Sequence, residues 1–248
     1  MEICKNCDKP IEHDYCGYCG QEADIERITF TYLWHDLFHF FTHIEKGFVY
    51  TTIRMLVSPG KVVIEYVDGK RKKYQTPISY FLIWTSIFIL TLYLFVKTFG
   101  EKSVIDYNNY FGPGLDTTFA ISNLSLMLAI IVPIQALHLF LVIMRPKYNY
   151  FESLVMAVYA VGTIICLQFV FALLSLLMFS FLHHPVDLRY SDIFKVGFLF
   201  WYTWSVLRNM SVKNKLMRGL VFLILAVATF TLWRLFGVPW IASMFVHT

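Results

Sequence analysis

The chain of 248 residues carries few charges for its size. Hydrophobic residues make up 57% of it, aromatic residues 18% and charged residues only 15%, and the mean hydropathy is +0.57. In an ordinary soluble domain about a quarter of the residues are charged, so the composition excludes that class of protein. The net charge of +4 is modest, and the placement of the charges along the chain says more than their sum.

Residues 1–22 carry a regular pattern of cysteines. Two C-x2-C pairs are separated by eight residues, and their members are Cys4, Cys7, Cys16 and Cys19. Four thiolates at this spacing suit tetrahedral Zn²⁺, and we expect Gly17 and Gly20 to adopt positive φ in the tight turns. The pattern predicts a structural zinc knuckle that obtains most of its folding free energy from the metal. Because protein fills all four positions, a catalytic role of the metal is not favoured.

The same cysteines would form disulfides or redox-active dithiols in another setting. No signal peptide precedes them, so we expect the N-terminal segment to remain in the cytosol, where thiols stay reduced. A thioredoxin-type dithiol would need a βαβ unit, which the sequence does not predict. Cys166 lies within an apolar run and is interpreted as an inert thiol.

Residues 23–77 form a second segment, in which apolar, aromatic and basic side chains are mixed. Residues 26–60 predict one or two amphipathic helices at the membrane interface, and residues 61–77 predict a short extended or turn-rich basic stretch. Pro59-Gly60 is interpreted as a helix stop and Asp68-Gly69 as a turn. The cations of DGKRKKY favour a topology signal that attracts anionic lipid headgroups, at about 1 kcal/mol each, over a nucleic-acid site.

Three histidines recur at helical spacing within this segment. In HDLFHFFTH, the residues His35, His39 and His43 stand at i, i+4 and i+8, nearly on one stripe of a helix. One interpretation is an interfacial helix whose polar stripe is histidine, opposite an aromatic face. The other is a second metal site or a pH-sensitive site. The aromatic richness favours the interfacial interpretation.

Residues 78–248 contain the long apolar runs. Because these runs are continuous and lipid offers no hydrogen bonds to the backbone, they predict helices and an all-α integral membrane protein. Five transmembrane helices are predicted at about 78–99, 123–144, 153–182, 193–207 and 217–237. Pro133 is expected to kink the second, and the fourth is short for a full crossing.

The charges of the connecting segments predict the orientation. Lys and Arg precede the first run and occupy the connections between the second and third and between the fourth and fifth, whereas the remaining connections carry acidic residues. The positive-inside rule then places the N-terminus in the cytosol and the C-terminus in the periplasm. A re-entrant fourth segment would put the cations of residues 208–218 on the outer side. Asp192, Lys195 and Arg234 are expected to reach the interface.

Few polar groups lie within the predicted membrane segments, and the notable ones are Gln135, His138 and Gln168. Intramembrane polar groups often mark function, but one histidine and two glutamines more often join helices by hydrogen bonds. A polar cavity of a transporter is the alternative. The chain shows no paired carboxylates, nucleophile elbow or phosphate-binding glycine loop, so an enzyme is not favoured.

Several motifs of the first third occur together in a known family. They are CKNC, YCGYCGQ, Arg27-Ile28-Thr29, Thr52, Leu56, Pro59, Gly60, Tyr66, Gly69, Lys70, Arg71, Tyr74 and Pro77. In these residues the chain resembles the DUF3667 proteins, bacterial integral membrane proteins of unknown function with an N-terminal zinc knuckle. The resemblance implies a membrane location and a zinc site, and it implies no reaction.

These observations favour a non-enzymatic protein of the bacterial inner membrane. Its expected role is that of a scaffold or accessory subunit, which docks a protein partner or a second copy through the knuckle and the amphipathic segment. The alternative is a small transporter, channel or lipid-handling protein. A membrane enzyme would need the three helix histidines to gather around a metal.

Overall fold

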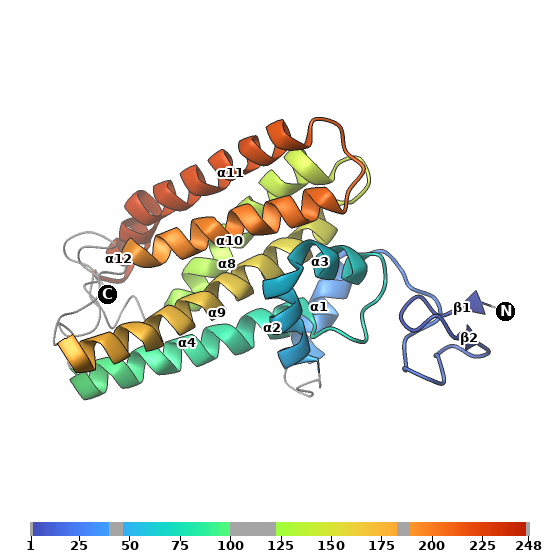
Figure 1. Cartoon of the computed structure of the whole chain (residues 1–248), viewed down its shortest axis with the longest axis horizontal. Coiled ribbons are helices and arrows are strands. Elements are labelled where there is room, and N and C mark those ends of the chain that lie inside the picture. Colours follow the sequence, from blue (N-terminus) through green and yellow to red (C-terminus); the bar gives the residue numbers. More distant parts are fainter. Residues whose placement is uncertain (1, 40–46, 100–122, 183–188, 247–248) are drawn as a thin grey trace.

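The structure, a computed structural model, describes residues 2–39, 47–99, 123–182 and 189–246. Its long helices lie side by side in one bundle, a layer of short helices covers one end, and a small two-stranded knuckle projects beyond that layer (Figure 1). The described elements are β1 (Glu2–Ile3), β2 (Pro10–Ile11), α1 (Phe30–His39), α2 (Phe48–Val57), α3 (Pro59–Val67), α4 (Pro77–Phe99), α8 (Leu124–Leu139), η1 (Phe140–Met144), α9 (Tyr150–Leu182), α10 (Arg189–Arg208), α11 (Lys215–Leu232), η2 (Trp233–Gly237) and α12 (Val238–Val246).

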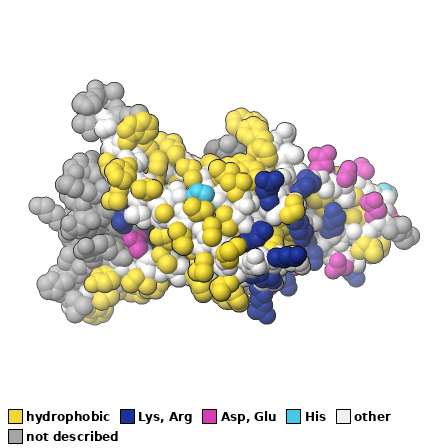
Figure 2. All heavy atoms as spheres, turned by 90° about the horizontal axis from the view of Figure 1, so that it is seen from above, with side chains coloured by type: hydrophobic (Ala, Val, Ile, Leu, Met, Phe, Trp, Pro, Cys, Tyr) yellow, Lys and Arg dark blue, Asp and Glu magenta, His cyan; other side chains and the backbone are white. Residues whose placement is uncertain are grey.

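Four stretches of the described chain are helical, long enough and apolar enough to cross a membrane. They are Pro77–Thr98, Ser125–Met144, Tyr150–Met178 and Lys215–Ile241. Large apolar side chains cover the outside of the bundle (Figure 2), as expected for a surface that faces lipid rather than water. The prediction of a helical protein with several membrane-type helices is therefore confirmed, and their number indicates a multi-pass membrane protein.

The fourth predicted span is a helix of different composition. Residues 193–207 lie within α10, which has 20 residues and packs against α9, α11 and α3. A helix of this length spans about 30 Å, but α10 is not apolar enough to be one of the four.

The short-helix layer consists of α1, α2 and α3, and the prediction for its last member was wrong. The predicted helices of residues 26–60 appear as α1 and α2. Residues 61–67, predicted as extended or turn-rich, belong instead to α3, which begins at Pro59. Proline fits the first helical position because the N–H it lacks would have no helical partner there. Val62, Val63, Tyr66 and Val67 then recur on one buried face of the helix.

Gly60 brings the backbones of α3 and α10 into contact. A Cβ atom added at Gly60 would lie 2.3 Å from the carbonyl carbon and oxygen of Ser205. In addition, the Gly60 N–H donates a hydrogen bond to Ser205 Oγ at 3.0 Å. No larger residue fits this contact without moving one helix, so Gly60 sets how closely the short-helix layer approaches the bundle.

The turn after α3 leads the chain into α4 through a set of partly buried polar contacts. Gly69 has φ +112° and ends α3, as the predicted turn requires. Glu65 accepts hydrogen bonds from Tyr74 Oη and Lys73 Nζ, both at 2.6 Å. Burial acts to raise the pKa of Glu65, but these two donors hold the pKa below its usual range. The Glu65 carboxylate and its two donors thereby hold the turn in place.

Replacing Gly60 by alanine tests the α3–α10 contact. We expect Gly60→Ala to lower the free energy of unfolding by about 1–3 kcal/mol, because the added methyl group overlaps the backbone of α10. The matched control is Gly197→Ala within α10, where an added Cβ meets no atom within 4 Å and better helix propensity stabilises by up to about 1 kcal/mol. Thermal unfolding of both purified variants in detergent measures the difference, and equal melting temperatures would contradict the contact.

Candidate metal centre

The knuckle, residues 2–22, consists of two similar loops that face each other. Strand β1 pairs antiparallel with β2, with Glu2 opposite Ile11, and the second loop closes through a single bridge between Tyr15 and Glu22. Each loop carries one C-x2-C pair, of which the first cysteine, Cys4 or Cys16, is buried.

Equivalent hydrogen bonds shape the two loops. The Cys4 carbonyl accepts from the Asp8 N–H at 2.9 Å, and the Cys16 carbonyl accepts from the Gly20 N–H at 2.8 Å. The residue after the second cysteine has a left-handed backbone in both loops, with φ +58° at Asp8 and +70° at Gly20. The expectation of positive φ is thus confirmed for Gly20 and wrong for Gly17. In the first loop the residue equivalent to Gly20 is Asp8.

The loops bring the four thiols to one point. The Sγ atoms of Cys4 and Cys19 are 3.6 Å apart, as are those of Cys7 and Cys16, and all four lie within 4.8 Å of one another. All are free thiols. In a tetrahedral site with metal–sulfur bonds of about 2.3 Å, the sulfur atoms are separated by about 3.8 Å. The donor set therefore fits one tetrahedral metal ion, and these four residues could hold it.

The environment of Cys16 favours its thiolate form, which is the form that binds metals. Burial acts to raise the pKa of Cys16, but hydrogen bonds from the backbone of Cys19 and Tyr18 and from the neighbouring thiols lower it to about 7. Burial and the neighbouring thiols raise the pKa of Cys7 to about 12 instead, so a metal ion that binds here has to displace the proton of that thiol.

Gln21 joins the knuckle to the turn that follows α3. Its side chain is buried, and Oε1 accepts hydrogen bonds from the backbone N–H groups of Arg71 and Lys72, both at 3.2 Å. The Arg71 guanidinium in turn donates to the Glu26 carbonyl at 2.7 Å and lies 4.5 Å from the centre of the Tyr32 ring. The CGQ motif of the knuckle is therefore in direct contact with the GKR motif of the turn.

Arg27 joins the segment after the knuckle to the bundle. Its guanidinium forms a two-pronged ion pair with Glu152, with Nε to Oε1 at 2.9 Å and Nη2 to Oε2 at 2.6 Å. This interaction raises the pKa of Arg27. Glu152 is only 2% exposed and lies in the first turn of α9. It also accepts the Asn149 N–H while Asn149 Oδ1 accepts the Glu152 N–H, which is a capping box.

The structure places the predicted motif residues in the contacts just described. Pro59 begins α3 and Gly60 contacts α10, whereas Gly69, Lys70 and Arg71 form the turn beside the knuckle. Tyr74 is buried against Glu65, and Pro77 begins α4. Of the predicted histidine stripe, His35 and His39 belong to α1, but their side chains and the whole of His43 lie outside the described residues.

The fold brings two of the three predicted intramembrane polar residues together. Gln135 and Gln168 line one cavity in the bundle, and Gln135 Nε2 donates to the Ala226 carbonyl at 3.2 Å, joining α8 to α11. His138 is not among the residues that line this cavity.

Sequence reasoning missed two sets of residues. The pattern N-x-x-E at residues 149–152 could have signalled the capping box, but its partner Arg27 is 125 residues away in the chain. Asp192, Lys195 and Arg234 were expected to reach the interface independently. Instead Lys195 is 8% exposed, and Asp192 accepts hydrogen bonds from Lys195 Nζ at 2.7 Å and Arg234 Nη1 at 3.1 Å. Their spacing in sequence gives no sign that one carboxylate serves both cations.

Fold and site together define a helical protein with membrane-type helices and a four-cysteine site outside the bundle. The family model of DUF3667, a family of proteins of unknown function, matches residues 45–89, which confirms the resemblance over α2, α3, the turn and the first half of α4. No curated protein matches the chain, and no solved structure does.

Metal analysis tests the site. We expect the protein purified without chelator to hold one metal ion per chain, and the double variant Cys4→Ser/Cys7→Ser to hold none, because it removes two of the four thiolates. Inductively coupled plasma mass spectrometry gives the count. Cys166→Ser is the control, since Cys166 belongs to α9 and its loss should leave the metal content unchanged. Metal that persists in the double variant would contradict the assignment.

Proposed function

We propose that the chain is a non-enzymatic protein of the bacterial inner membrane that presents a zinc knuckle to a protein partner in the cytosol. The observation that carries this proposal is the way the knuckle is held. Gln21 and Arg27 fix it to the bundle on one side, while its acidic and aromatic side chains remain exposed on the other. A segment with only a structural role for its own chain would not need such a surface.

Zinc is the metal that the donor set supports best. Four thiolates in tetrahedral reach of one point are typical of structural zinc sites, and they leave no open position for water or substrate. The site also requires reduced thiols, which agrees with a cytosolic location.

The arrangement of the cations supports the proposed orientation. A band of Lys and Arg side chains surrounds the end of the bundle next to the knuckle (Figure 2) and is here called the basic belt. It consists of Lys61, Lys70, Arg71, Lys72, Lys73, Arg145, Lys147, Arg208, Lys213, Lys215 and Arg218. It lies between the apolar bundle and the acidic knuckle. The positive-inside rule assigns such a belt to the cytosolic surface, where it also contacts anionic lipid headgroups.

The position of α10 supports a fifth span. It lies lengthwise beside α9 and α11 (Figure 1), and Ile193, Phe194 and Phe200 are exposed on its outer face. Its charged residues Asp192 and Lys195 face the bundle instead. Five crossings put the C-terminal end of α12 at the end of the bundle remote from the knuckle, and therefore on the periplasmic side.

Reporter fusions test the five-span proposal. Alkaline phosphatase is active only outside the cytosol, so we expect activity when it is fused after Thr248 and none when it is fused after Lys213, between α10 and α11. A green fluorescent protein fused at the same positions should show the opposite pattern. Active phosphatase after Lys213 would mean that α10 does not cross the membrane.

The exposed surface of the knuckle indicates the chemistry of the partner. Residues 1–26 contain seven acidic side chains against two lysines, a formal charge of −5, although the whole chain carries +4. Between these acids stand Ile3, Tyr15 and Tyr18, which are 62–72% exposed. Aromatic residues within a charged rim are typical of protein interfaces, and the charge selects a basic surface. We therefore infer that the partner presents a Lys- or Arg-rich segment.

Photo-crosslinking in living cells tests this docking role. A benzoyl-phenylalanine placed at Tyr18 is expected to form an adduct with one reproducible protein, through a Lys- or Arg-rich peptide identified by mass spectrometry. The charge reversal Glu12→Lys/Asp14→Lys, at two exposed positions, should reduce the adduct about tenfold or more. The same probe at Ile53, on the exposed face of α2, is the control and should not yield it. Adducts with only a second copy of the chain, or none, would overturn the proposal.

The alternative of a small transporter or channel rested on Gln135, His138 and Gln168 together. Only the two glutamines share a cavity, which weakens a polar pathway through this region. The cavity itself has a different use, which is independent of the docking role.

A further inference from the structure

The bundle contains a partly open cavity of about 250 Å³ between α8, α9, α10 and α11. This volume is just below the lower end of the range for small-molecule sites. Its walls are apolar over most of their length, and residues such as Ile131, Ala160, Ile164, Val196 and Ala226 contribute to them. The cavity therefore suits a hydrocarbon chain and not a polar solute.

One end of the cavity is charged. Asp192, Lys195 and Arg234, here called the charged cluster, all line it. The Asp192 carboxylate receives both cations, and Lys195 Nζ also lies 5.5 Å from the centre of the Phe230 ring. The two cations that line this end present donors suited to an anion, and they come from different helices, α10 and η2.

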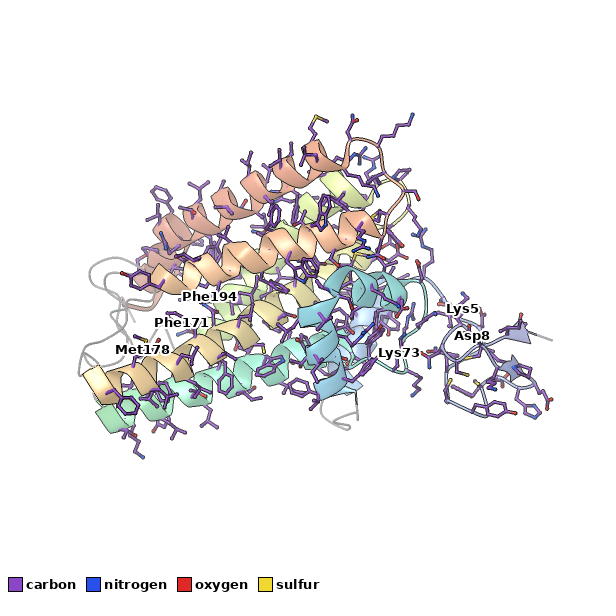
Figure 3. All side chains as sticks on the ribbon, viewed as in Figure 1. Lys5, Asp8, Lys73, Phe171, Met178 and Phe194 are labelled. Carbon is purple, nitrogen blue, oxygen red and sulfur yellow. The ribbon has the colours of Figure 1, made fainter. Side chains whose placement is uncertain are left out.

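The charged end of the cavity lies toward the end of the bundle remote from the knuckle. Asp192 is the fourth residue of α10, and Arg234 follows the end of α11. Close to this level the rings of Phe171 and Phe194 pack against each other across α9 and α10, with centroids 5.8 Å apart (Figure 3). On the proposed topology this end faces the periplasm, and it lies inside the apolar spans, about 10 Å from their ends at Met178 and Ile241, while the apolar walls extend further toward the middle of the bilayer.

A structural ion pair alone would explain why Lys195 is tolerated in the bundle, but not why it borders a cavity. Charges within a membrane bundle usually face a cavity that has a function. The combination of an apolar slot and a cationic rim in the outer half of the bundle matches one kind of molecule, which is abundant around the protein.

We propose that this cavity binds the acyl chain of an anionic amphiphile, with the anionic group at Lys195 and Arg234. The anion is the phosphate of a phospholipid or the carboxylate of a fatty acid. The site is distinct from the basic belt, which lies at the opposite end of the bundle.

Photoreactive lipids test the site. The protein is reconstituted in phosphatidylcholine vesicles with a small fraction of phosphatidylglycerol that carries a diazirine at the end of one acyl chain. Parallel samples contain palmitic acid or phosphatidylcholine with the same diazirine. We expect the phosphatidylglycerol or the fatty-acid probe to label cavity residues such as Ile164 and Ala226 about tenfold more than the phosphatidylcholine probe does, since a charged hydrogen bond accounts for such a factor. Which anionic probe labels decides between phosphate and carboxylate.

Two variants and a control make the result decisive. Ala160→Phe fills the cavity and should abolish the labelling, whereas Ile224→Phe adds similar bulk at an exposed position of α11 and should not. Lys195→Met/Arg234→Met should remove the preference for the anionic probe and keep residual labelling of the walls. Equal labelling by phosphatidylcholine in the unmodified protein would overturn the headgroup assignment. Labelling confined to outward residues such as Ile224, unchanged in Ala160→Phe, would overturn the site.

Discussion

The buried carboxylate of Glu152 is the constraint on which the arrangement of the N-terminal third depends. It sits at the start of the longest helix, almost without exposure to solvent, and a carboxylate in such a place requires a cation and hydrogen-bond donors. Arg27 and the Asn149 N–H satisfy it. Because Arg27 follows the knuckle by only a few residues, the ion pair determines where the knuckle meets the bundle.

The segment of residues 45–89 acts as the connecting element between knuckle and membrane helices. On one side Gly60 brings α3 against the backbone of α10, and the Gln75 carbonyl accepts a hydrogen bond from Tyr159 Oη of α9. On the other side the N–H groups of Arg71 and Lys72 hold Gln21. The family match coincides with this segment, and its motif residues have a structural role: they hold the four-cysteine knuckle against the helical bundle.

The sequence could predict features whose cause is local. Cysteine spacing predicts the metal site, continuous apolar runs predict the membrane helices, and both are properties of short segments. The prediction for α3 was wrong because the β-branched run Val62-Val63-Ile64 resembles a strand, whereas the buried face against α10 decides for a helix. The burial of Lys195 and the Arg27–Glu152 ion pair depend on which helix faces are turned inward and on partners 42 to 125 residues away. No single-sequence pattern reports such contacts.

The contacts of Gln21 and Arg27 fix the knuckle to the bundle, so that it is not carried on a loose tether. Hydrogen exchange of the intact, metal-loaded protein measures this directly, by comparison of the unmodified chain with the double variant Gln21→Ala/Arg27→Gln. We expect backbone amides of residues 21–29 and 70–74 to exchange about tenfold or more faster in the variant, while those in the middle of α9 do not change. Equal exchange at residues 70–74 in both proteins would show that the knuckle does not depend on these contacts and is carried on a tether.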